Sequence, residues 1–339
     1  MLHRQLPLEL PLSKGVACAR KEHRQSLVGE GLAERSLSEA DLVAKLNQVF
    51  YDVEAAQYDV RHPEVIEGDA QWWSRRGEVL IRDLRTRFTT GRGLLILDVG
   101  CGTGFVASAL GNYLADGDLV VGLDQSEGML MRARSKLAGK TVSRCRFVRG
   151  DAARLPFPDH IFHMLTLNSI LHHVYDYRSV LRECDRALKP GGYLLMAHEP
   201  NKEFFQSPLR RLAASAYKLA GFGMKLPKDI YEQINSRLSE SHLAASAASA
   251  EDILRLVEYH SPVEQGAVRI DKNKGFSLPE LRATELRGYV LIELNEYSTF
   301  YHRPQLERRP WLMRVAQTAA RLLNGKGNLF SAVLRKAAA

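Results

Sequence analysis

One stretch of this sequence, residues 94–104, constrains the fold more than any other. It opens with four aliphatic residues and an acid, Asp98, a pattern typical of a strand buried on both faces in the middle of a parallel sheet. Three glycines then stand at alternate positions, namely Gly100, Gly102 and Gly104. Glycine lets the backbone turn tightly and lie against a ligand, because no Cβ atom stands in the way. Since a helix is expected to begin at Phe105, the stretch predicts a nucleotide-binding loop in an α/β fold.

The spacing of the glycines narrows the kind of nucleotide. A dinucleotide-binding loop, G-x-G-x-x-G/A, requires glycine or alanine where this sequence has Phe105, and the Gly-Lys-Ser/Thr of a P-loop does not follow. The D-x-G-x-G-x-G sequence of residues 98–104 resembles motif I of the class I S-adenosylmethionine-dependent methyltransferases, where the loop passes under the methionine part of the cofactor. The resemblance implies S-adenosyl-L-methionine as cofactor and assigns Asp98, Gly100, Gly102 and Gly104 to its site. It also leads us to expect that Gly104→Val abolishes cofactor binding without unfolding the domain.

Two further acids follow at the ends of the next expected strands. Residues 119–123 indicate a second buried strand that ends at Asp124, where a carboxylate is placed to accept hydrogen bonds from both ribose hydroxyls. Residues 146–152 indicate a third strand with Asp151 at its end. The counterpart of Asp151 binds the adenine amine in the family that this chain resembles. The resemblance extends over residues 94–203 and adds four contacts to the cofactor, from Gln125, Met129, Ala152 and Asn168.

The residues before the glycine loop resemble the N-terminal lid of small-molecule methyltransferases. A helical pattern begins near Ser38 and leads into two aromatic–acid pairs, Tyr51-Asp52 and Tyr58-Asp59. In the family an aromatic ring at this place covers the cofactor, so the resemblance adds Tyr51 and Tyr58 to the cofactor site. Packing of both rings in a hydrophobic core is the alternative.

The expected fold class is α/β, with a Rossmann-like, mostly parallel sheet of seven strands, an N-terminal helical lid and a helical insertion after strand five. Lys189-Pro190-Gly191-Gly192 is expected to form a turn before that fifth strand. The expected divisions of the chain are a poorly ordered tail at 1–38, a helical lid at 39–92, a cofactor-binding core at 93–202, a helical substrate cap at 203–275, and a C-terminal completion of the sheet with a basic amphipathic helix at 276–339.

Methyl transfer from a sulfonium mainly requires an aligned acceptor, because the cofactor supplies both the reactive methyl group and the leaving group. An acceptor hydroxyl, amine or carbon acid also requires a base. The candidates at the carboxyl edge of the sheet are His172, His173 and Glu199, of which His173 and Glu199 are preferred. A structural histidine and a helix-capping carboxylate are the alternatives. The four cysteines have no metal-site or disulfide spacing, so no metal is expected.

The charge of the chain is concentrated at its C-terminal end. The net charge is +8, and residues 302–339 carry eight basic side chains against one acid, Glu307. Such a surface can attract nucleic acid, an anionic membrane or an acidic substrate, and a solvated helix face without a partner is the alternative. The segment Asn168-Ser169-Ile170-Leu171 lacks the N/D-P-P-Y/F sequence of nucleic-acid amino methyltransferases, so no stable nucleic-acid partner is expected. The segment resembles instead the ubiquinone/menaquinone-biosynthesis type and related natural-product methyltransferases.

The resemblance therefore implies an enzyme that methylates a small, largely apolar molecule, with or without an anionic group, such as an isoprenoid, a fatty or aromatic acid or a natural-product intermediate. Transient contact with a membrane surface is compatible with the basic helix. Two alternatives stay open, a protein that binds the cofactor without methyl transfer and an RNA-modifying methyltransferase. The sequence shows no run of about 18 apolar residues and no apolar leader, so a cytoplasmic location is expected. No feature predicts the oligomeric state.

Overall fold

The computed structural model describes residues 38–62, 70–88, 93–139, 144–219, 225–240, 249–264, 269–297, 311 and 327–338. The expected tail at 1–38 and the expected basic helix near 306–323 therefore lie almost wholly outside the described residues. Within the described part, no helix combines the length and apolar composition that crossing a membrane requires.

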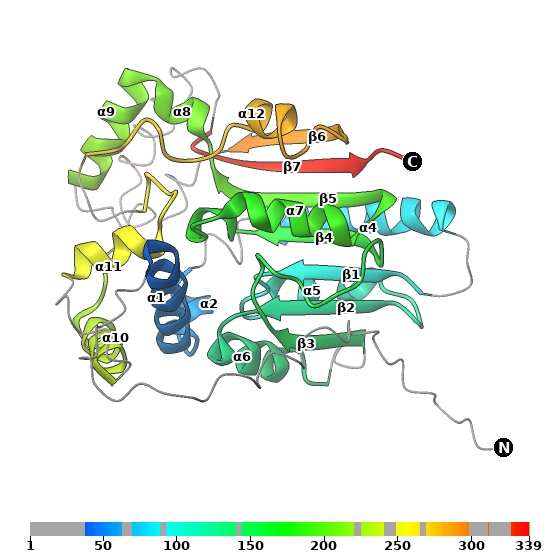
Figure 1. Cartoon of the computed structure of the whole chain (residues 1–339), viewed down its shortest axis with the longest axis horizontal. Helices are drawn as coiled ribbons and strands as arrows, with labels where there is room; N and C mark the ends of the chain where they lie inside the picture. The colour runs from blue at the N-terminus through cyan, green and yellow to red at the C-terminus, as the bar shows by residue number, and fades with distance from the viewer. Residues whose placement is uncertain are drawn as a thin grey trace, which may run out of the picture.

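Seven strands form one sheet in the order β3-β2-β1-β4-β5-β7-β6 (Figure 1). Their bounds are β1 Leu95–Val99, β2 Leu119–Asp124, β3 Cys145–Arg149, β4 Phe162–Asn168, β5 Leu188–Pro200, β6 Tyr289–Tyr297 and β7 Leu329–Lys336. The first five strands are parallel, and β7 runs antiparallel to both of its neighbours. The predicted α/β class and seven-stranded sheet are thus confirmed.

Strand β5 begins earlier than its sequence suggests. Leu188 already pairs with Phe162 of β4, and an irregularity in the register follows before Tyr193 pairs with Met164. The expected proline–glycine turn is therefore wrong, because residues 189–192 form a bulge within the strand.

Helices cover both faces of the sheet, as the alternation of side chains along buried strands requires. Ile96 of β1 packs in the cluster that contains Trp73 and Leu84, whereas Leu97 packs in the cluster that contains Val180. The helices of the first face are α4 Ala70–Arg87, α5 Phe105–Leu110 and α6 Glu127–Leu137, and those of the second face are α7 Tyr177–Ala187 and α12 Leu278–Ala283. The strands are therefore buried on both sides, and their carboxyl ends form the accessible edge.

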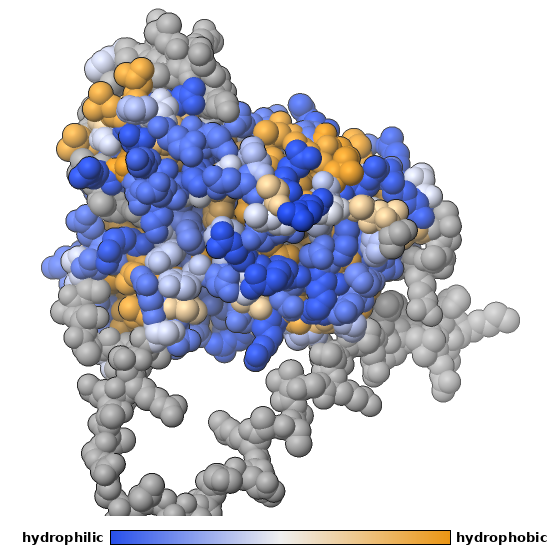
Figure 2. Space-filling model, turned by 45° about the horizontal axis from the view of Figure 1, so that its top comes forward, coloured by the Kyte–Doolittle hydropathy of each residue, from blue (hydrophilic) through white to orange (hydrophobic). Residues whose placement is uncertain are grey.

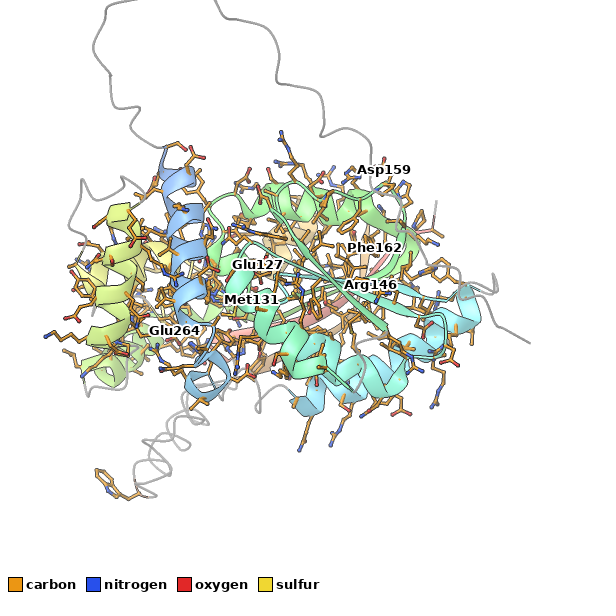
Figure 3. All side chains as sticks on the ribbon, turned by 90° about the horizontal axis from the view of Figure 1, so that it is seen from below. Glu127, Met131, Arg146, Asp159, Phe162 and Glu264 are labelled. Atoms are coloured by element: carbon orange, nitrogen blue, oxygen red, sulfur yellow. The ribbon has the colours of Figure 1, made fainter. Side chains whose placement is uncertain are left out.

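A helical cap stands at that edge. Its helices are α1 Glu39–Glu54, α2 Tyr58–Arg61, α8 Lys202–Gln206, α9 Pro208–Tyr217, α10 Lys228–Glu240 and α11 Ala250–Val257. Phe50 of α1 packs with Ile234 of α10 and Ile253 of α11 in a separate hydrophobic cluster. Figures 1 and 3 both show α1 between the insertion helices and the sheet. The N-terminal segment and the insertion thus share one core, whereas α4 packs on the sheet.

Two exposed apolar patches lie away from the cap core. One follows the edge strand β6, through Val290, Ile292 and Leu294, and the other lies on α9, through Leu209 and Leu212 (Figure 2). On β6 the exposed residues alternate with partly buried ones, so one face of this edge strand lacks a covering helix among the described residues.

Candidate functional site

The glycine loop follows β1 at the carboxyl edge of the sheet. Gly100, Gly102 and Gly104 have φ angles of 67°, 51° and 78°, in the left-handed region that favours glycine. The Gly100 N–H donates to the carbonyl of Leu123 at 2.7 Å. The Gly102 N–H donates to Oδ2 of Asp124 at 2.8 Å. These bonds join the loop to the end of β2 and leave its other side open.

A cavity of about 270 Å³ lies against this open side. Ten of the twelve residues expected to contact the cofactor line it, together with one expected base; they are Tyr51, Tyr58, Gly100, Gly102, Asp124, Gln125, Met129, Asp151, Ala152, Asn168 and His173. Asp98, Gly104 and Glu199 are not among the lining residues. The structure thus brings together residues from α1, the glycine loop and the ends of three strands.

Asp98 lies immediately before the glycine loop and is 1% exposed. Its Oδ1 accepts a hydrogen bond from Oγ1 of Thr166 at 2.8 Å, whereas its buried Oδ2 has no hydrogen-bond partner among the described residues. Burial raises the pKa of Asp98 from 3.8 to about 7, against the opposing effect of the Thr166 hydrogen bond. A buried carboxylate oxygen without a donor fits a cationic ligand, so the site suits the ammonium and sulfonium groups of S-adenosylmethionine.

Asp124 and Asp151 contribute carboxylates to the cavity wall. Oδ1 of Asp124 accepts the N–H of Ser126 at 2.9 Å, in addition to the bond from the glycine loop. Burial raises the pKa of Asp124 to about 6, although the N–H groups of Ser126 and Gly102 oppose the rise. Asp151 is exposed, and its Oδ1 accepts the N–H of Ala153 at 2.9 Å. Carboxylates around one cavity favour a ligand that carries positive charge and hydrogen-bond donors.

The acids of the two aromatic–acid pairs attach the cap to the start of α6 and to the glycine loop. Asp52 accepts a hydrogen bond from the hydroxyl of Ser126 at 2.6 Å. Asp59 accepts one from the hydroxyl of Thr103 at 2.6 Å and forms an ion pair with Lys136 at 2.7 Å. Sequence reasoning used only the tyrosines of these pairs, although the repeat of Tyr-Asp after seven residues also pointed to the acids.

His173 faces Tyr51 across the cavity. The Tyr51 hydroxyl lies 3.1 Å from Nε2 of His173, and Nδ1 of His173 lies 2.9 Å from the carbonyl oxygen of Val257. Burial raises the pKa of Tyr51 well above its usual value and lowers the pKa of His173 well below its usual value. The neutral phenol therefore donates to Nε2, and the Nδ1–H donates to the carbonyl. An imidazole with so low a pKa is a weak base, so the geometry favours orientation of an acceptor over proton removal.

Glu199 is fully buried near the end of β5. Its Oε1 accepts the N–H groups of Ile170 and Leu171, each at 2.9 Å. Its Oε2 accepts the N–H of His172 at 3.2 Å and lies 2.8 Å from Nδ1 of the same residue. Burial raises the pKa of Glu199 to about 7, and the N–H donors of Leu171 and Ile170 oppose the rise. The geometry contradicts the expected base and makes Glu199 a positioning residue for η3, Leu171–His173.

A second cavity of about 40 Å³ adjoins the first. Both are lined by Tyr51, Tyr58, Ser169 and His173. The further lining residues of the second cavity include His62, His172, His198, Glu258 and Glu264. Two non-glycine residues on its wall, Ser169 and His198, have φ angles of 57° and 59°. Backbone strain of this kind concentrates at functional sites, and no sequence pattern indicated it here.

Gly104 does not face the cofactor cavity. A Cβ atom at this position would lie 3.2 Å from Cβ of Ala133 and 3.3 Å from Cδ1 of Leu137, both on α6. The reason given for the effect of Gly104→Val is therefore wrong, because the valine side chain would contact α6 and not the cofactor. A valine there would strain the backbone at φ 78° and press on α6.

Gly102→Ala is expected to weaken cofactor binding at least about tenfold, because Gly102 lines the cavity and its added Cβ, which no protein atom contacts within 4 Å, would occupy space beside the cofactor. Gly139→Ala is a matched control, since Gly139 also has a positive φ of 79° and open space around its Cβ but lies outside the cavity. Both variants should lose roughly 1 kcal/mol of stability from the left-handed backbone. Calorimetric titration should show weak binding only for Gly102→Ala; equal affinities would mean that the cofactor does not contact the loop at Gly102.

Known proteins share this arrangement. Residues 97–196 match the family model described as a methyltransferase domain. The chain is 33% identical over 190 residues to the ubiquinone/menaquinone biosynthesis C-methyltransferase UbiE of Shewanella frigidimarina, a match that covers 56% of this chain and 68% of that protein. It is 38% identical over 110 residues to the demethylmenaquinone methyltransferase of Geobacillus kaustophilus, covering 32% of this chain and 47% of that protein.

Solved structures give a coarser comparison. An S-adenosylmethionine-dependent methyltransferase from Mesorhizobium loti aligns with 80% of this chain and 100% of its own length, at 20% identity and a TM-score of 0.43. The similarity in sequence to the curated enzymes, the strand order and the cavity at the glycine loop agree. The chain belongs to the class I S-adenosylmethionine-dependent methyltransferases, and it is an enzyme that uses S-adenosyl-L-methionine.

Proposed function

We propose that this enzyme transfers a methyl group to a small, largely apolar molecule whose acceptor group enters the second cavity. The observation that carries the proposal is the pair of adjoining cavities, which share Tyr51, Tyr58, Ser169 and His173 as a common wall. The larger cavity has the acids and glycines of the cofactor site. The smaller one meets it where a methyl group would have to pass.

The small volume of the second cavity and the helical cap above it favour a small substrate. Its volume of about 40 Å³ admits an acceptor group and not a whole polymer segment. The cap helices α1, α10 and α11 close over the same edge through their shared hydrophobic cluster. A substrate with an apolar body suits the larger cavity beside this cap, whose lining includes Ala40, Val43 and Ala44 of α1, because apolar surface is stabilised by burial.

The acceptor group is expected to be neutral when it enters. Glu258 and Glu264 line the second cavity, and burial raises the pKa of Glu258 well above its usual value. A hydroxyl, an amine or a carbon acid suits this wall better than a carboxylate or phosphate does.

An anionic group elsewhere on the substrate stays a prediction, since most of the basic segment 302–339 lies outside the described residues. If the substrate carries such a group, replacing Arg308, Arg309 and Arg314 with Gln should weaken substrate binding and reduce the dependence of that binding on salt.

The acids at the cofactor cavity and beside it have proposed roles. Asp98 attracts the cationic end of the cofactor, Asp124 binds the ribose hydroxyls and Asp151 the adenine amine. The indole N–H of Trp73 donates to Oδ1 of Asn168 at 3.0 Å, which fixes the amide at the end of β4. S-adenosylmethionine supplies the methyl group and the leaving group when it is bound. The chain then has to align the acceptor and exclude water, for which Tyr51 is well placed.

The test is a transfer experiment with a cofactor that carries a deuterated methyl group. The protein is incubated with a metabolite extract and, separately, with cellular RNA, and both are analysed by mass spectrometry. We expect labelled small molecules with the wild-type protein and with Gly139→Ala, and much less label with Gly102→Ala. Calorimetry with S-adenosylmethionine and its demethylated product runs in parallel.

Each outcome separates one alternative. Tight cofactor binding without label in either fraction would favour a protein that binds the cofactor without transfer. Label confined to RNA, together with RNA binding that collapses in salt, would favour an RNA-modifying enzyme. Either result would overturn the proposed substrate class.

A further inference from the structure

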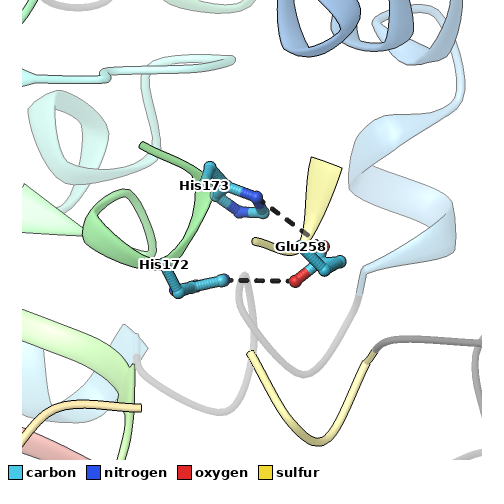
Figure 4. Close-up of side chains that lie close together, drawn as sticks. All are labelled: His172, His173 and Glu258. Carbon is cyan, nitrogen blue, oxygen red and sulfur yellow. Dashed lines mark ion pairs between the residues drawn. The ribbon is translucent and has the colours of Figure 1, made fainter. Parts of the chain in front are cut away.

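Three side chains of the second cavity converge on one point. Nε2 of His172 lies 3.5 Å from Oε2 of Glu258, and Nδ1 of His173 lies 3.7 Å from Oε1 of the same carboxylate (Figure 4). Each of the three residues has a ligand atom within 4.8 Å of the others, and all three side chains are 12% exposed or less. Two imidazoles and one carboxylate are a donor set that first-row transition metals prefer.

The proton positions at His172 support a cation at this point. Glu199 accepts backbone N–H groups on both of its oxygens and lies 2.8 Å from Nδ1 of His172. A carboxylate held in this way takes the Nδ1–H as one more donor, so the lone pair of the neutral ring is on Nε2. That lone pair points at Oε2 of Glu258. A shared proton or a cation between these two atoms removes the repulsion between their lone pairs.

His172 and Glu199 are arranged like a metal-binding histidine and the carboxylate that accepts its second N–H. A histidine that binds a metal through one ring nitrogen almost always donates its other N–H to a carboxylate or carbonyl, which fixes the ring and its tautomer. Glu199 gives this support to His172. His173 has the carbonyl of Val257 at 2.9 Å from Nδ1 and the Tyr51 hydroxyl at 3.1 Å from Nε2, so it would bind a metal through one of these nitrogens in exchange for that hydrogen bond.

The separations suit an ion of this class. Bonds from zinc to imidazole nitrogen or carboxylate oxygen are about 2.0–2.2 Å long, so neighbouring ligand atoms in a tetrahedral site are roughly 3.3–3.6 Å apart. The 3.5 Å from Nε2 of His172 to Oε2 of Glu258 lies within that range, and the 3.7 Å from Nδ1 of His173 to Oε1, the other oxygen of this carboxylate, lies just outside it. The adjacency of the two histidines does not prevent convergence, because η3 places their ring centroids 4.0 Å apart.

We propose that His172, His173 and Glu258 bind a divalent transition-metal ion, such as zinc or iron, whose open positions face the second cavity and take an oxygen atom of the methyl acceptor. The role toward the acceptor rests on the proposed function, whereas the binding of the ion does not. Glu258 is 85 residues from His173 along the chain, which is why sequence spacing gave no sign of the site.

The experiment measures the ion directly and needs no acceptor. Full-length protein without a histidine tag is stripped with a chelator, dialysed, and titrated with Co²⁺ by calorimetry and visible absorption; metal content after purification is measured by mass spectrometry. We expect one equivalent of Co²⁺ with ligand-field absorption. Glu258→Gln should bind Co²⁺ at least about 100-fold more weakly, because it loses a charged ligand but keeps the shape of the side chain.

Glu264→Gln is the matched control, since Glu264 lines the same cavity and its charge also acts on Glu258 but it is not in the cluster. Equal weakening by both substitutions, or no Co²⁺ absorption in the wild-type protein, would overturn the metal site in favour of diffuse attraction or a shared proton. Circular dichroism verifies that each variant is folded. Metal binding without methyl transfer would contradict the proposed function alone, whereas full transfer by metal-free protein would contradict the role of the ion.

Discussion

Glu199→Ala is expected to lower the free energy of unfolding by about 3–5 kcal/mol, because it leaves several buried donors without an acceptor. The N–H groups of Ile170, Leu171 and His172 all donate to this carboxylate. The loss should be larger than that of any exposed substitution in the cap. Urea unfolding followed by circular dichroism measures it.

Glu199→Gln is the informative companion. The amide keeps one oxygen acceptor but turns an NH₂ group toward N–H donors, so an intermediate loss of stability is expected. Cofactor affinity should fall with both variants, since Ile170 lines the cavity and would lose its anchor. An alanine variant within 1 kcal/mol of the wild-type protein, by contrast, would show that water replaces the carboxylate and that Glu199 does not hold η3.

Asp98→Asn is expected to have opposite effects on cofactor affinity and on stability. Loss of the buried charge should weaken S-adenosylmethionine binding by roughly 10- to 100-fold, the range for a charged hydrogen bond. Without cofactor, however, the same variant should be more stable than the wild-type protein at pH 8 by up to roughly 4 kcal/mol, because the pKa of about 7 in the folded state exceeds the usual 3.8.

The sign of the pH dependence follows from that raised pKa. Between pH 4 and 7 the folded protein holds a proton on Asp98 that the unfolded chain has lost, so the stability of the wild-type protein falls as pH rises through this range. Cofactor affinity rises with pH over this range, since only the ionised carboxylate attracts the cation. Asp124, with a pKa of about 6, adds to the rise in affinity. Asp98→Asn should flatten both curves near pH 7. Unfolding and calorimetry at several pH values measure them, and parallel curves for the two proteins would mean that another group titrates.

The central part of the fold could be predicted from the sequence because its signals are local. A buried strand followed by an acid occurs at Asp98 and Asp124, and parallel strands bring their carboxyl ends to one edge, so the strand order and the cavity were within reach. The cap could not be predicted in the same way. Phe50 and Ile253 lie about two hundred residues apart in the sequence, and an amphipathic pattern says which face is apolar but not which partner covers it.

The errors of the sequence-based prediction have the same physical origin. The glycine at position 104 and the carboxylate at position 199 were assigned by their place in a motif, whereas the direction of a Cβ and the partners of a buried oxygen depend on tertiary structure. Asp52 and Thr166 escaped notice because the hydrogen bonds of each reach residues far along the chain or on a neighbouring strand.

The carboxylate of Glu199 binds mainly backbone N–H groups. The backbone path of this segment therefore does not depend on the side chains that determine which substrate binds. Three of its four contacts are to backbone N–H groups, which every residue except proline provides at positions 170–172. Side chains on this segment can therefore be exchanged while the chain keeps its path. This segment beside the proposed acceptor site is thus a natural place for the enzyme to acquire a new substrate, and libraries that randomise positions 170, 172 and 173 should yield many folded proteins.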